Sequence, residues 1–169
     1  MKNIVLGVIP LLILIMGCGS SPSSIAGKTL DNALVAASAE IDGTLAVNTI
    51  IAFVNFNSTD KFYAYVLDEL TANLVKSKHL TVIDRTEIAL RRNELNFQMS
   101  GEVSDESMQS LGRTLGAQSI ISGSLTELNG QYRMVIRVLN VETGMVEVMY
   151  RDNIRIDATT SALLRDSAW

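Results

Sequence analysis

The chain has 169 residues, of which 47% are hydrophobic and 19% are charged, and its formal net charge at pH 7 is −4. No clustered run of Lys or Arg interrupts this acidic balance, which argues against nucleic acid as a partner, because phosphate binding needs a concentrated positive surface. One cysteine and one histidine exclude an intramolecular disulfide and argue against a zinc or iron site.

The first residues have the pattern of an export signal. Lys2 precedes an apolar run over residues 4–16, and Gly17 and Cys18 follow it. The run is about a dozen residues, whereas a membrane-spanning helix needs ~20, so a permanent span is the poorer interpretation. We therefore predict a signal peptide at residues 1–17. Residues 15–18 (Ile-Met-Gly-Cys) resemble the lipobox of bacterial lipoproteins, which implies lipidation of Cys18; the alternative is a lone cysteine in an ordinary secretory signal.

The mature chain is expected to begin with a short tether at residues 18–28, which is small, polar and Ser-rich and has little to bury. Loss of Lys2 leaves 13 basic against 18 acidic side chains, a net charge of −5. Residues 29–169 are long enough for one domain with an ample core. We expect a single domain there.

The first half of the domain alternates helices with buried strands. Apolar spacing predicts a helix over residues 29–41, ended by Gly43. Residues 49–56 are an apolar run typical of a central strand buried on both faces. A second helix follows, carrying Phe62, Val66, Leu70 and Leu74 on one face. Residues 79–84 predict a second strand, parallel to the first because a helix separates them.

Two shorter helices come next. Asp84 and Glu87 have capping-box spacing for a helix through about residue 97, and residues 104–106 cap another that Gly116 ends.

From Gln118 onward the apolar period changes to two. Asn129-Gly130 predicts a hairpin, residues 142–144 predict the next turn, and Val146, Val148 and Tyr150 are expected to share a face. The order is β-α-β-α-α-β-β-β with a C-terminal antiparallel meander. It predicts an α/β fold, or α+β sandwich, with one mixed sheet and helices packed on it.

No residue cluster in the sequence predicts catalysis, a metal or a cofactor. His79 is expected to be a surface or edge histidine, and Ser122-Gly123-Ser124 lies inside a strand, where glycine permits close packing. Glu102, Asp105 and Glu106 could serve as general acid and base, but their place at a helix start favours capping. Arg91-Arg92 are expected on a solvated helix face. The glycines lack phosphate-loop spacing.

Four stretches carry a family resemblance: Leu80-Thr-Val-Ile-Asp-Arg85, Asn93-Glu-Leu-Asn-Phe-Gln98, Ser100-Gly-Glu-Val-Ser-Asp105 and Leu115-Gly-Ala-Gln-Ser-Ile-Ile-Ser-Gly123. They resemble the CsgG/LpoB-like family of bacterial lipoproteins, and the likeness continues through Val138-Leu-Asn-Val-Glu-Thr-Gly144. The family implies one of two functions. CsgG forms a ring-shaped outer-membrane pore that exports curli subunits, and LpoB activates a penicillin-binding protein in cell-wall synthesis.

The sequence lacks one characteristic feature of CsgG and one of LpoB. Residues 99–103 and 129–131 are too short for the membrane hairpins of a pore, and about ten tether residues replace the long arm of LpoB-like activators. The resemblance implies a non-enzymatic envelope lipoprotein that acts by protein–protein binding and regulates or scaffolds a cell-envelope complex, with a penicillin-binding protein as its partner. The alternative is an oligomeric component of a curli-type secretion complex, with homo-oligomerisation possible in either case. Gly19 after Cys18 implies the outer membrane by resemblance to enterobacterial sorting, with the domain facing the periplasm.

Overall fold

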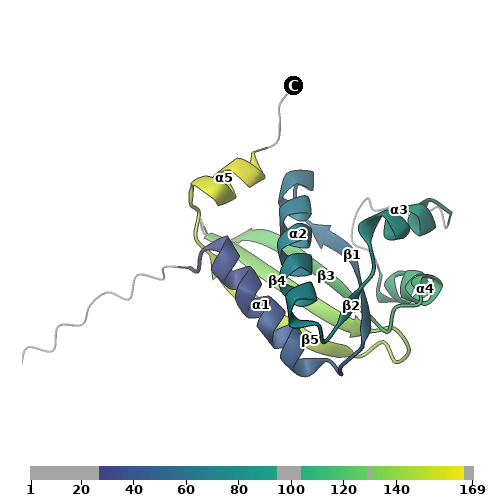
Figure 1. The fold of residues 1–169 in the computed structure, drawn as a ribbon. Coiled ribbons are helices and arrows are strands. Elements are labelled where there is room, and N and C mark those ends of the chain that lie inside the picture. Colours follow the sequence, from purple (N-terminus) through teal and green to yellow (C-terminus); the bar gives the residue numbers. More distant parts are fainter. Residues whose placement is uncertain (1–26, 95–103, 129–130, 166–169) are drawn as a thin grey trace, which may run out of the picture.

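A computed structural model describes residues 27–94, 104–128 and 131–165 of the chain. One five-stranded mixed sheet has the order β2-β1-β3-β4-β5, in which β1 is parallel to β2 and β3 and the other pairs are antiparallel (Figure 1). The predicted fold class is confirmed. The elements are α1 (Leu30–Thr44), β1 (Ile50–Asn57), α2 (Asp60–Ser77), β2 (Thr81–Val82), α3 (Arg85–Glu94), α4 (Asp105–Leu115), β3 (Ser119–Leu128), β4 (Gln131–Asn140), β5 (Val146–Ile154) and α5 (Ala158–Leu164).

Helices α1 and α2 cover one face of the sheet (Figure 1). Each begins at a threonine, Thr29 or Thr59, whose side chain accepts a hydrogen bond from a first-turn backbone N–H. The predicted apolar faces of both helices are buried. Helix α1 does not end at Gly43 as predicted but continues to Thr44, because the N–H of Leu45 still bonds to the carbonyl of Ile41 at 3.0 Å.

Helices α3 and α4 cover part of the opposite face. Their buried side chains, Ile88, Met108 and Leu111, pack with Val54 of β1 and Ile120 of β3. Strand β1 is therefore buried on both faces, as its continuous apolar run predicted. The predicted helix ends are also confirmed: Ser104 caps α4, and Gly116 ends it in the left-handed conformation at φ 69°.

Strand β2 is shorter than the predicted residues 79–84. Lys78 ends α2 in the left-handed conformation, and the Asp84 side chain accepts a 2.7 Å hydrogen bond from the N–H of Thr86 at the start of α3. These two helix ends leave only Thr81 and Val82 to pair with β1.

The meander pairs β3 with β4 from Ser119 and Asn140 to Leu128 and Gln131, which confirms the hairpin, although Asn129-Gly130 lie outside the described residues. Strand β5 differs from the prediction. The register between β4 and β5 shifts between Val146 and Val148. Val148 pairs with Val138 and Val146 pairs with Leu139, so Glu147 is an extra residue with none opposite it on β4. This irregularity breaks the period of two. Val148 and Tyr150 are buried, whereas Val146 is exposed.

Two contacts at the ends of the described domain were not predicted from the sequence. The backbone of Lys28 pairs with the end of β5, and helix α5 contacts α2, with the Thr59 hydroxyl donating to the carbonyl of Leu163 at 2.8 Å. Figure 1 shows α5 near the first turn of α1. One end of the sheet therefore holds both chain ends of the described domain.

Candidate protein-binding surface

Three rows of side chains cross β3, β4 and β5 on the sheet face opposite α1 and α2. The register places one residue of each strand in each row. We call this surface the open sheet face; its rows are Thr126–Arg133–Asn153, Ser124–Val135–Arg151 and Ser122–Arg137–Met149.

Strand alternation explains why these residues face outward. Met134, Ile136 and Val138 are buried in the core cluster beneath α1 and α2, so the alternate residues of β4 must point to the other face. Arg133, Met149 and Arg151 are exposed there. The rows contain three arginines and no acidic residue, although the chain as a whole is acidic.

The arginines differ in how firmly they are held. Arg137 donates from one terminal nitrogen to both carboxylate oxygens of Asp105, at 3.2 and 3.1 Å, while its buried Nε–H has no partner among the described residues. Arg133 Nε lies 3.4 Å from the side-chain oxygen of Asn153. Arg151 has no polar partner within the described part of the chain. A polar groove of about 330 Å³ lies between Arg133, Arg151, Asp152 and Asn153.

A charged cluster borders this groove. Lys28 Nζ lies 2.7 Å from Asp152 Oδ2, and the Tyr150 hydroxyl donates to the same oxygen at 2.9 Å. Burial would raise the pKa of the Asp152 carboxyl, but the hydrogen bonds from Lys28 and Tyr150 outweigh it and lower that pKa. The same contact raises the pKa of Lys28. The cluster fixes the point where the chain enters the domain.

A second hollow lies between α2 and α3. It has a volume of about 480 Å³ and is lined by Asp60, Tyr63, Ala64, Leu67, Thr86, Ile88 and Ala89. Its walls are mostly apolar, and it offers no group of converging titratable side chains. The size and mostly apolar lining of this groove suit an apolar side chain of a partner.

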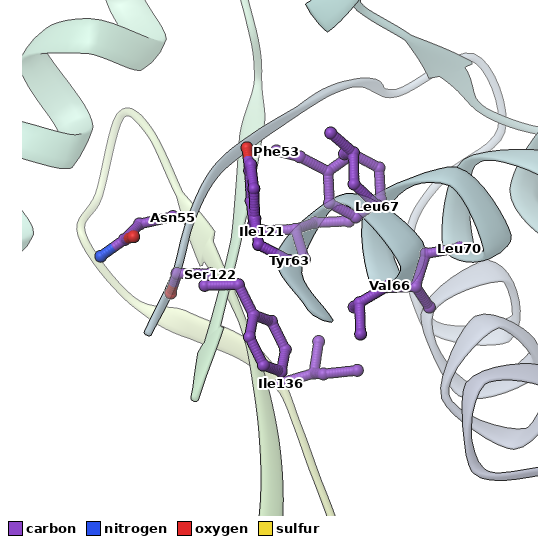
Figure 2. Close-up of a pocket in the computed structure, with 10 residues that line it drawn as sticks. Phe53, Asn55, Tyr63, Val66, Leu67, Leu70, Ile121, Ser122 and Ile136 are labelled. Carbon is purple, nitrogen blue, oxygen red and sulfur yellow. The ribbon is translucent and has the colours of Figure 1, made fainter. Parts of the chain in front are cut away.

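The space between α2 and the sheet is not a ligand cavity. Figure 2 shows Val66, Leu67 and Leu70 facing Phe53 and Ile136, and only about 10 Å³ remains open between them. This is at the lower limit for one water molecule. Gly123 belongs to the same packing, because a Cβ there would lie 2.5 Å from the Phe56 ring, which confirms the close-packing interpretation of this glycine.

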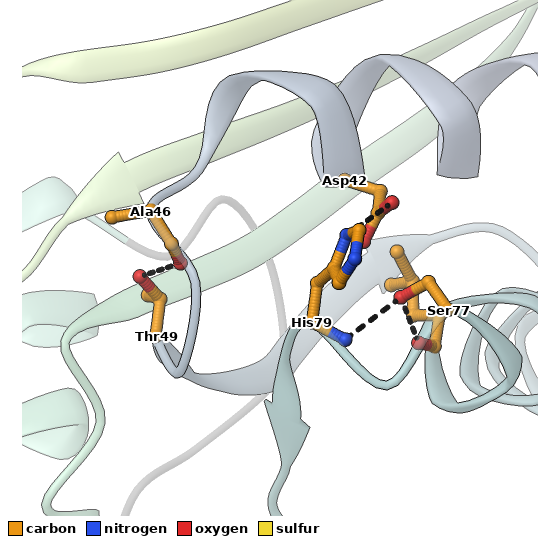
Figure 3. Close-up of polar contacts among 6 residues, drawn as sticks. Asp42, Ala46, Thr49, Ser77 and His79 are labelled. Atoms are coloured by element: carbon orange, nitrogen blue, oxygen red, sulfur yellow. Dashed lines mark hydrogen bonds and ion pairs between the residues drawn. The ribbon is translucent and has the colours of Figure 1, made fainter.

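The structure places the other residues considered for chemistry apart from one another. His79 is exposed, as predicted, and its Nδ1 lies 3.2 Å from Asp42 at the ends of α1 and α2 (Figure 3). Asp105 pairs with Arg137, and Glu106 is exposed in the first turn of α4. Cys18 and Glu102 lie outside the described residues, as do the side chains of Arg91 and Arg92.

Within the described ranges, no three His, Cys, Asp or Glu side chains are close enough to hold a metal ion. None of the helices seen there is both long and apolar enough to cross a membrane.

The open sheet face was not predicted as a unit. Alternation along a single strand puts Arg133 and Arg137 on one face of β4, and Met149 and Arg151 on one face of β5. What alternation does not give is the register between strands, and only the register brings Arg133 and Arg151 to one groove.

Comparison with protein families gives a match over most of the chain. The family described as "Peptidoglycan-synthase activator LpoB" matches residues 28–154. A comparison with curated proteins gives no significant match.

Solved structures share the fold at low sequence identity. The C-terminal domain of LpoB from Escherichia coli matches with a TM-score of 0.62 at 12% identity, over 75% of this chain and 98% of that chain. The same domain from Salmonella enterica gives 0.63 at 11% identity, with the same coverage. The NMR structure of E. coli LpoB gives 0.60 at 12% identity, over 92% of this chain and 83% of that chain.

Proposed function

Because the chain belongs to the LpoB family of peptidoglycan-synthase activators, we propose that it binds a peptidoglycan synthase of the cell envelope and activates it through the open sheet face. In this proposal the protein acts by contact and does not itself catalyse. The family match supports the activator role and gives no support to the alternative of a curli-type secretion component.

We choose the open sheet face because three arginines gather on it although the chain as a whole is acidic. Arginine and methionine are enriched in protein interfaces, and Arg133, Arg151 and Met149 are exposed on this face beside the partly buried Val135. Such a surface fits a partner that presents carboxylates around a small apolar centre.

The proposal includes a lipid anchor. Lipidation of Cys18 would leave about ten residues before the domain, and a flexible linker of that length averages under ~20 Å from end to end. The domain would stay near its membrane, which we propose is the outer membrane with the domain in the periplasm. The synthase would then have to present its binding region close to that membrane.

Binding to the purified peptidoglycan synthases of the same organism tests the surface. We expect the double variant Arg133→Glu/Arg151→Glu to lose most of the affinity measured by isothermal titration calorimetry. Lys61→Glu is the matched control, because Lys61 is an exposed residue of α2 on the other side of the sheet. Equal affinities for wild type and both variants would contradict the proposed surface.

Mass spectrometry of the mature amino terminus tests the anchor separately. We expect a diacylglyceryl-modified Cys18 as the first residue. An unmodified terminus at another position would refute the anchor and leave the proposed binding surface standing.

A further inference from the structure

The groove between α2 and α3 combines apolar walls with a polar rim. Its volume is about 480 Å³. Its apolar lining includes the buried Leu67 and Ile88 and the half-buried Tyr63. The carboxylate of Asp60 and the hydroxyl of Thr86 belong to exposed residues of the same lining, and both can accept a hydrogen bond. The groove therefore suits a large, mainly apolar side chain that carries a hydrogen-bond donor.

The chain leaves the described domain next to this groove. The Thr59 hydroxyl donates to the carbonyl of Leu163 at 2.8 Å, so the last turn of α5 is held at the start of α2. Leu163 and Leu164 also pack against the core cluster beneath α1 and α2. Asp60, which lines the groove, directly follows Thr59 in the chain. Figure 1 shows α5 and α3 on either side of the first turn of α2, so the chain leaves α5 within a short distance of the groove.

Residues 166–169 lie outside the described residues, and their length is sufficient to reach the groove. Four residues beyond Arg165 extend at most roughly 13–14 Å. The part of α2 that lines the groove runs from Asp60 to Leu67, which is about 11 Å along a helix axis at ~1.5 Å per residue. The half of the groove nearer to Asp60 is therefore within reach of Trp169.

Trp169 has the chemistry that the groove suits. Residues 166–169 read Asp-Ser-Ala-Trp, so Trp169 carries the one large apolar side chain among them. An indole combines a broad apolar surface with a single N–H donor, and that donor usually finds a partner when the ring is buried. Asp60 and Thr86 offer acceptors for it. Because the indole is tethered within reach, its effective concentration at the groove is high, which favours it over an untethered occupant.

We propose that the groove between α2 and α3 is the docking site of Trp169, whose indole packs between the two helices. In this arrangement residues 166–169 cross the first turn of α2 and connect α5 to α3. The groove shares no residue with the open sheet face, so this inference does not rest on the proposed synthase partner. An apolar side chain of a partner could enter the groove only by displacing Trp169.

Tryptophan fluorescence of the purified full chain tests the docking, because Trp169 is the only tryptophan in the sequence. We expect the emission of the native protein to be blue-shifted from that of the urea-unfolded protein. Quenching by acrylamide should be several-fold weaker in the native protein, because a docked indole is shielded from the quencher. Native emission at the unfolded wavelength, with equally strong quenching, would overturn the proposal.

A variant of the groove wall shows where the indole lies. Ala89→Arg puts a long charged side chain into the groove from an exposed position of α3, and arginine is a good helix former. We expect it to move the emission towards that of the unfolded protein while the far-UV circular dichroism stays unchanged. Ala39→Arg is the matched control, because it makes the same substitution at an exposed position of α1 outside the groove, and it should keep the native emission.

Equal emission from wild type and both variants would mean that Trp169 packs elsewhere and would overturn the proposal. So would a blue shift that appears only at high protein concentration, since it would place Trp169 against a second copy. NMR of the wild-type protein checks the position without any variant. We expect nuclear Overhauser contacts between the indole protons and the methyl groups of Ile88, and their absence would contradict the docking.

Discussion

Arg137 of β4 donates hydrogen bonds to both carboxylate oxygens of Asp105, at 3.2 and 3.1 Å, and so joins the sheet to the first turn of α4. Asp105 also lies at the positive end of the α4 dipole, beside the capping Ser104. The contact holds Arg137 at the border between the helix-covered and the open parts of the sheet face.

Replacement of Asp105 by Asn tests this contact. The variant keeps the size of the side chain but loses the charge, and a partly exposed ion pair contributes about 0.2–1 kcal/mol. We expect a loss of that order in the free energy of unfolding, measured by urea denaturation. A loss of several kcal/mol would mean that α4 depends on this pair far more than its exposure suggests.

Truncation of one core side chain in β1 and one in β3 tests the strand assignments. Val54 and Ile121 are 0% and 2% exposed, on opposite faces of the sheet. Changing either to Ala should cost about 2–5 kcal/mol, with Val54 near the lower figure. Val47→Ala, at an exposed position, should change the free energy of unfolding by less than about 0.5 kcal/mol. Equal small effects at all three positions would contradict the packing.

A pair of glycine variants separates close packing from helix propensity. A Cβ at Gly123 would lie 2.5 Å from the Phe56 ring and 2.7 Å from the carbonyl of Val135, so Gly123→Ala should destabilise by about 1–3 kcal/mol. A Cβ at Gly43, within α1, would meet nothing within 4 Å. Gly43→Ala should therefore stabilise by about 0.4–1 kcal/mol. Thermal unfolding of both variants and wild type measures the two changes. If both variants are stabilised or both are destabilised, the surroundings described for one of the two glycines are wrong.

Tyr65 gives a pH-dependent test. Its hydroxyl donates to Asp31 at 2.5 Å, and this hydrogen bond, with burial, raises the pKa of Tyr65 to about 12. A folded-state pKa above the ordinary value of 10 means that the contribution to stability is complete below pH 10 and is lost as the pH rises towards 12.

The matching variant is Tyr65→Phe. It should be about 1 kcal/mol less stable than wild type at pH 8, and the difference should shrink at pH 11. Denaturant unfolding at the two pH values measures both differences, and a constant difference would contradict the Tyr65–Asp31 contact.

The sequence predicted features that depend on local chemistry. Ser104 and Gly116 bound α4 because a hydroxyl and a left-handed residue satisfy helix ends wherever they occur. The burial of β1 on both faces followed from its apolar run, and the Asn129-Gly130 pair correctly indicated the β3–β4 hairpin.

Other features depend on contacts between distant segments. Helix α5 has seven residues and little amphipathic pattern, and it is held by tertiary contacts such as that between Thr59 and Leu163. The extra residue Glu147 in β5 is bound through its carboxylate by Ser119 and Asn140, at 2.6 and 3.0 Å, which no local pattern reveals. The open sheet face likewise needs the register of three strands before its arginines can be seen as one surface.

Peptidoglycan synthesis by the purified synthase tests the central claim most directly. The measurement is the initial rate of glycan polymerisation from the lipid-linked precursor in liposomes, with and without the lipidated protein. We predict that wild type and Lys61→Glu raise this rate, and that Arg133→Glu/Arg151→Glu fails to do so while unfolding at the wild-type temperature. Full activation by the double arginine variant would contradict the open sheet face as the activating surface, and no activation by wild type of any synthase of the organism would contradict the activator role itself.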